Sequence, residues 1–211
     1  FIANAKKPRS VFVTDPKGEI YHVTSKMLYD RGYKILTIDF RHPELSNHIN
    51  ILEPIICEYE KYIEFENKAD NTDNEEEKLD YLNKSISSYA ETNRLITSIA
   101  SMITYDKSQG KDPIWNNSAK NLLEGLIGFF LEEYKDGKVK REQITMTSIR
   151  KFQNSTMEEK NSKKFKYYIE QKPYGAKSKD SLIPILSSSE NTYKSITSVF
   201  SEKMAIFDDV N

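Results

Sequence analysis

The sequence is poor in residues on which several classes of protein depend. It has one cysteine, Cys57, so no disulfide can form within the chain, which fits a reducing compartment. Cys57 follows Ile55 and Ile56, and we expect it to be a small buried hydrophobe. The longest apolar patch, at 126–131, is far too short to span a bilayer. We therefore expect a soluble chain, with any membrane anchor outside these 211 residues.

Motifs for nucleotide hydrolysis are also missing. There is no Gly-x-x-x-x-Gly-Lys-Ser/Thr loop, whose backbone N–H groups and lysine would hold phosphates. No run of apolar β residues ends in Asp-Glu, and the nearest match, Ile206-Phe-Asp-Asp209, closes a predicted helix. We therefore expect no ATP hydrolysis by this chain.

Charge is balanced overall but unevenly distributed. The net charge is -1, so it favours neither nucleic acid nor a basic partner. Residues 58–80 hold ten acidic side chains against three lysines, whereas residues 160–179 hold seven lysines against Glu170. These runs predict one acidic and one basic surface.

The first 48 residues have an α/β pattern. Val11-Phe-Val13 is rich in β-formers, and the turn residues 15–18 follow it. Residues 20–31 read as a helix with Gly32 as its C-cap, and residues 34–40 return to strand character. Two strands joined by a helix predict one parallel βαβ unit.

From residue 49 onward the apolar period becomes helical. The pattern predicts an all-α domain over 49–211, with helices near 54–66, 75–105, 113–134, 145–153, 157–171, 181–188 and 190–207. The helix at 113–134 is apolar on most sides and should be the central one. The apolar stripe expected to face inward from the helix at 75–105 consists of Leu79, Leu82, Ile86, Tyr89, Ile96, Ile99 and Ile103. The fold class is thus mainly α, with a partial βαβ unit at the N-terminus.

Three groups of side chains are candidates for function. Asp15, Lys17 and Glu19 follow the first predicted strand, where open α/β sheets place their chemistry, although turn and helix capping would explain them equally. A basic cluster is interleaved with aromatic residues, a composition that suits nucleic acid but also a solvated helix face: Lys160, Lys163, Lys164, Lys166, Lys172, Lys177 and Lys179. The acidic group could dock a basic protein or be a solvated surface: Glu64, Glu66, Asp73, Glu75, Glu76 and Glu77. His22, His42 and His48 match no metal-ligand spacing, and we expect no metal site.

An ordered set of motifs resembles one family. Val13-Thr-Asp-Pro-Lys-Gly-Glu19, Gly32-Tyr-Lys34 and Ile49-Asn-Ile-Leu52 look like TraG-type coupling proteins of type IV secretion. Asp112-Pro-Ile-Trp-Asn-Asn-Ser-Ala-Lys120, Leu122-Leu-Glu-Gly-Leu126, Ser195-Ile-Thr-Ser-Val-Phe200 and Phe207-Asp-Asp209 follow in the family's order. The acidic insertion near 60–78 resembles the branch found in Gram-positive conjugative elements.

The resemblance implies a fragment of a membrane-anchored, hexameric ATPase whose RecA-like motor is interrupted by an all-α domain. Residues 1–48 would be a partial RecA-like domain, beginning after the Walker A helix, and residues 49–211 would end before the Walker B strand. ATP and magnesium would belong to the parent, where Asp15, Lys17 and Glu19 would lie near the nucleotide. The all-α domain would face the cytoplasm, and the fragment alone would be a monomer without a cofactor.

Two functions follow from the resemblance. The first is docking of the relaxase and its relaxosome accessory proteins for delivery to the secretion channel, with the acidic group as the docking surface. The second is direct DNA binding, through Lys163, Lys164, Lys166, Lys172 and Lys177, or oligomerisation within a DNA-pumping ATPase.

Overall fold

The computed structural model describes residues 9–39, 41–42, 46–47, 49–105, 113–157 and 159–208, with the backbone alone at 113 and 159–161. Phe40, at the end of the second predicted strand, His48, Asp209 and the side chain of Lys160 lie outside this description. The chain forms two compact units, Phe1–Ile49 and Asn50–Asn211.

The described residues of the first unit contain one helix, α1 (Glu19–Tyr29). Gly18 precedes it with a positive φ of 75°, and Gly32 follows it with a φ of 82°, a region that glycine enters without steric cost. The amide of Tyr33 donates to the carbonyl of Leu28, which closes the C-terminal end of the helix.

The predicted βαβ unit is wrong in its strands, because residues 9–39 contain no β-strand. The two segments form no β-ladder, and apolar side chains in both remain exposed, including Phe12 at 87% and Leu36 at 59%. The backbone of Thr37 is hydrogen-bonded to Asn47 instead. Helix α1 buries no residue, and Val23 is 80% exposed. A strand exists only through a hydrogen-bonded neighbour, and parallel sheets are stable when both faces are covered. The described residues of this unit provide neither condition.

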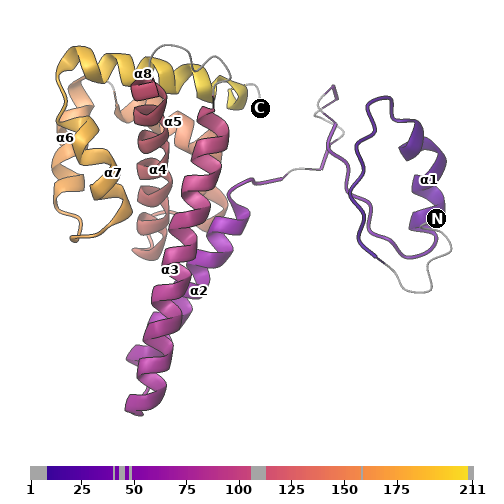
Figure 1. Cartoon of the computed structure of the whole chain (residues 1–211), viewed down its shortest axis with the longest axis horizontal. Helices are drawn as coiled ribbons and strands as arrows, with labels where there is room; N and C mark the ends of the chain where they lie inside the picture. Colours follow the sequence, from indigo (N-terminus) through magenta and orange to yellow (C-terminus); the bar gives the residue numbers. More distant parts are fainter. Residues whose placement is uncertain are drawn as a thin grey trace. The chain divides into compact units, whose positions relative to one another are not determined.

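The second unit is helical, as the period predicted (Figure 1). Its helices are α2 (Glu53–Asp70), α3 (Glu75–Thr104), α4 (Pro113–Lys135), α5 (Met146–Thr156), α6 (Glu159–Glu170), α7 (Lys177–Leu186) and α8 (Glu190–Met204), with 3-10 turns η3 (Arg141–Gln143) and η4 (Ala205–Phe207). Proline opens α4 and occupies the first turn of α2, where its missing N–H is harmless. Helix α7 continues past Pro184.

Helix α4 is the centre of this unit, as predicted. Every residue from 122 to 131 is buried, and helices α2, α3, α5, α7 and α8 all contact α4. Helix α7 approaches closely because Gly125 and Gly128 lack side chains: a Cβ at Gly125 would lie 2.6 Å from the side chain of Leu182.

Helices α2 and α3 form a long antiparallel hairpin whose tip extends past the other helices of the unit (Figure 1). Its interface is made of tyrosine rings and small residues. The ring centroids of Tyr62 and Tyr89 are 5.1 Å apart, and Ala69 is fully buried near the tip.

The expected orientation of α3 is wrong in its first turns and correct from Tyr89 onward, since Tyr89 packs against the core. Ile96 is buried there, and Ile99 and Ile103 pack against the core. Between residues 85 and 92 the buried residues are Ser85, Ser88 and Thr92, and the expected inward residues Leu79, Leu82 and Ile86 are exposed.

Cys57 also differs from expectation, because its side chain is exposed rather than buried. Its thiol lies 3.6 Å from a carboxylate oxygen of Glu53 and 3.7 Å from the guanidinium of Arg141. No helix among the described residues combines the length and apolar character needed to cross a membrane.

Candidate functional site

The tip of the α2–α3 hairpin is built by local sequence. Asn74 caps α3, and its side-chain oxygen accepts hydrogen bonds from the amides of Glu76 and Glu77 at 3.0 and 3.3 Å. Glu75, Glu76 and Glu77 fill the first turn of α3, where carboxylates interact favourably with the positive end of the helix dipole. The cap and the dipole together fix an acidic first turn at the exposed end of the hairpin.

The structure brings most of the predicted acidic group together around this tip. Glu64, Asp73, Glu75, Glu76 and Glu77 are exposed on the last turns of α2, the connecting loop and the first turn of α3. Glu64 accepts from Lys68 at 2.5 Å, and Glu77 accepts from Thr72 at 3.3 Å.

Glu66 has a different role from the rest of this group. It is half-buried, accepts from the hydroxyl of Tyr62 at 2.8 Å and forms an ion pair with Lys135 at the end of α4. Glu66 therefore fastens the hairpin to the central helix.

The predicted basic cluster is divided by the fold. The side chain of Lys172 is only 10% exposed, and its ammonium contacts Glu133 of α4 at 2.5 Å. The ammonium of Lys177 contacts Glu124 of α4 at 2.5 Å. Burial lowers the pKa of Lys172, but the hydrogen bonds and charges of Glu133 and Asp136 together outweigh it, and the net shift of the pKa is upward. These two lysines neutralise buried carboxylates of α4 instead of lining a surface for phosphates.

Lys179 lies on α7, where its ammonium donates to the carbonyls of Glu170 and Lys172 at 2.8 Å. The remaining lysines of the predicted cluster lie on α6. Lys163 and Lys164 are exposed, and Lys166 lies 3.8 Å from Glu170. Phe165 and Ile169 are buried, so the aromatic character of this helix partly serves the core, while Tyr167 is 67% exposed. A smaller basic surface is therefore left on α6.

The turn before α1 serves a capping role. A carboxylate oxygen of Asp15 accepts from the amide of Tyr21 at 2.9 Å, within the first turn of the helix. Lys17 and Glu19 are exposed beside it. A phosphate would need that same helix N-terminus, which the negative charge of Asp15 already occupies.

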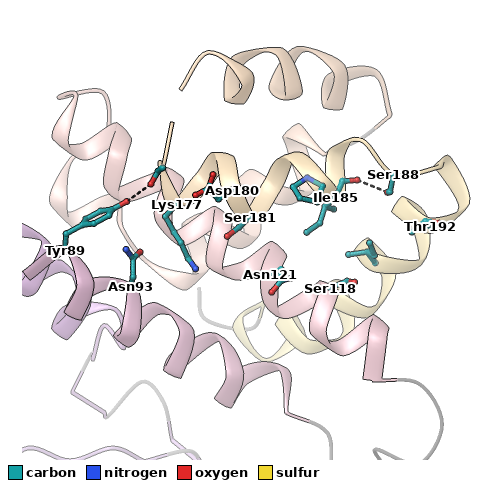
Figure 2. Close-up of a pocket in the computed structure, with 13 residues that line it drawn as sticks. Tyr89, Asn93, Ser118, Asn121, Lys177, Asp180, Ser181, Ile185, Ser188 and Thr192 are labelled. Carbon is teal, nitrogen blue, oxygen red and sulfur yellow. Dashed lines mark hydrogen bonds between the residues drawn. The ribbon is translucent and has the colours of Figure 1, made fainter. Parts of the chain in front are cut away.

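A polar pocket of about 560 Å³ lies between α3, α4, α7 and α8 (Figure 2). The hydroxyl of Tyr89 donates to the carbonyl of Gly175 at 3.4 Å at one end, and Ser188 bonds to the carbonyl of Ile185 at 2.7 Å at the other. The buried Oδ1 of Asn93 accepts no hydrogen bond within the described part of the chain. The pocket therefore offers one acceptor to a donor group.

Sequence reasoning missed this pocket because its residues come from four helices and no local motif joins them. In the second unit no histidine is present to activate the pocket serines, since all three histidines precede residue 50. In the described residues no group of His, Cys, Asp and Glu side chains has an arrangement that would hold a metal ion.

Comparison with known proteins identifies the family. Residues 2–211 match the family model described as Type IV secretory system Conjugative DNA transfer. The chain belongs to this family, that of the TraG-type coupling proteins. No curated protein and no solved structure matches the chain.

Proposed function

We propose that residues 50–211 dock protein cargo, the relaxase and its relaxosome partners, onto a conjugative coupling protein. Membership of the DNA-transfer family supports a role in moving DNA–protein substrates. The observation that carries the docking role is the α2–α3 hairpin, whose tip extends past the other helices of the unit (Figure 1). The connecting loop and the first turn of α3 carry the exposed carboxylates of Asp73, Glu75, Glu76 and Glu77, and Glu64 is exposed nearby on α2. An acidic projection of this kind suits a basic protein and repels DNA.

In this proposal the chain performs no chemistry. ATP and magnesium belong to the motor of a hexameric, membrane-anchored parent that passes cargo to the secretion channel, and the docking domain lies on the cytoplasmic face. The capping role of Asp15 supports this division, because its carboxylate places a negative charge at the N-terminus of α1, which disfavours phosphate there. ATP turnover by the purified chain would contradict it.

Charge reversal tests the docking proposal. Relaxase from the same conjugative element is titrated with the full chain at two salt concentrations, because contacts between exposed charges are screened beyond about 10 Å at 0.1 M salt. We expect Glu75→Lys, Glu76→Lys and Glu77→Lys together to weaken binding strongly at low salt. The matched control reverses Lys163, Lys164 and Lys166 to glutamate on α6 and should bind normally. Equal binding by both variants would contradict the proposal.

A second candidate function is DNA binding by α6, favoured by the exposed Lys163, Lys164 and Tyr167. Each lost phosphate contact should lower the salt dependence of DNA affinity by roughly one unit of slope. Gel shifts with single- and double-stranded DNA decide between the two. Tight DNA binding that disappears only in the α6 variant, without relaxase binding, would favour this function.

A further inference from the structure

Three large apolar side chains form an exposed stripe on the first half of α3. Leu79, Leu82 and Ile86 are 61%, 40% and 67% exposed. Their spacing of three and four residues places them on one face over two turns of the helix. We name Leu79, Leu82 and Ile86 the outer face of α3.

The opposite side of the same turns is unusually polar. Ser85, Ser88 and Thr92 are 5%, 6% and 1% exposed against the rest of the unit, and the hydroxyl of Thr92 donates to the carbonyl of Ser88 at 2.8 Å. A surface helix normally turns its apolar stripe inward and its polar residues outward. In this part of α3 the apolar residues face outward and the polar residues face inward. The small buried residues allow α2 to approach closely.

A single exposed leucine needs no explanation, but an aligned apolar stripe opposite a buried polar one does. The described residues of the second unit leave the stripe uncovered, since α3 satisfies its packing through the small face. The outer face is therefore an aligned, exposed apolar surface of the kind that binds a partner.

The charges around the outer face determine which partner fits. Glu75 and Glu76 lie one turn before Leu79 on the same side of the helix. Between residues 64 and 86 there are eight acidic side chains against three lysines, and two of those lysines are held by Glu64 at 2.5 Å and Asp80 at 2.6 Å. A second copy of the chain would bring acidic margins together, which is unfavourable.

We propose that the outer face of α3 receives a basic amphipathic helix of the protein cargo. Apolar residues of that helix at positions i, i+3 or i+4 and i+7 would cover Leu79, Leu82 and Ile86, and lysine or arginine on its flanks would meet the glutamates of the first turn. This inference rests on the proposed function, and it names the segment of cargo that the hairpin selects.

Two probes test the proposal with the full chain. The first is a synthetic helical peptide with leucines on one face and lysines on the other, paired with a peptide in which glutamate replaces every lysine. The second is the relaxase from the same conjugative element. The test variant combines Leu79→Ser, Leu82→Ser and Ile86→Ser, and the control variant combines Met102→Ser and Ile114→Ser, which are 74% and 58% exposed elsewhere on the unit. Melting temperatures of both variants are measured first.

We expect the test variant to bind the lysine peptide and the relaxase at least about tenfold more weakly, because truncating buried interface anchors removes most of the binding energy. The control should match the wild type, and the glutamate peptide should not bind. Undiminished relaxase binding by the test variant would overturn this inference and leave the proposed function standing. Loss of peptide binding in a chain that never binds relaxase would support the docking surface and overturn the relaxase assignment. A wild-type dimer in sedimentation that the test variant abolishes would overturn the proposal in favour of a second copy.

Discussion

Cys57 lies on α2 between a carboxylate and a guanidinium. Burial and the charge of Glu53 raise the pKa of its thiol, although Arg141 acts in the opposite direction. The thiolate is the reactive form, so a raised pKa lowers reactivity at a given pH. We predict slower alkylation by iodoacetamide at pH 8 than for a free cysteine peptide, and a severalfold acceleration in Glu53→Gln. Glu58→Gln, one residue after Cys57, is the control, and an unchanged rate in Glu53→Gln would contradict the electrostatic explanation.

Lys172 is a structural residue in this account. Its ammonium lies 2.5 Å from Glu133 and 3.3 Å from Asp136. Lys172→Met leaves Glu133 with the hydroxyl of Tyr168 and the more distant Lys138, and we predict a loss of about 3 kcal/mol in unfolding free energy by urea denaturation. Lys163→Met on the exposed face of α6 should cost under about 0.5 kcal/mol. Similar values for both would mean that the Lys172 pair contributes no net stability.

The packing of α7 on α4 depends on glycine. Gly125→Ala should lower stability by about 1–3 kcal/mol through steric conflict with Leu182, partly offset by about 1 kcal/mol of improved helix propensity. In a Leu182→Ala background the same change should be neutral or stabilising, because the space is then open. Identical effects of Gly125→Ala in both backgrounds would refute the close contact.

Helix positions were largely predictable from the sequence because the 3.6-residue period, prolines and loop residues are local signals. The predicted strands around Val11 and Ile38 are absent, since a local β pattern does not guarantee a neighbouring strand. The buried face of the first turns of α3 was not predictable either. Exposed Leu79 and buried Ser85 lie on opposite sides of the helix, and the helical period alone does not decide which side faces inward.

In the candidate site, too, the features made of neighbouring residues were predictable and those made of distant residues were not. The acidic tip is contiguous in sequence and could be anticipated. No local pattern encodes the ion pairs that Glu66, Lys172 and Lys177 form with residues of α4, because the partners are 39 to 69 positions apart in the sequence. Basic composition alone therefore overstated the surface available to DNA.

The second unit has its own core, centred on α4, and should fold without the first. We predict that a chain lacking residues 1–48 keeps a single cooperative thermal transition by circular dichroism, because all the residues of the buried core cluster lie in the second unit. A broad, non-cooperative transition would show that the first unit completes that core.

Hydrogen exchange of the full chain with and without relaxase tests the docking account most directly. Amides near a helix end exchange through local opening, and a bound partner suppresses that opening. The account predicts new protection at residues 64–86 of the α2–α3 hairpin, with residues 159–170 of α6 unchanged. Protection confined to α6, or none on the hairpin while relaxase is bound, would contradict it.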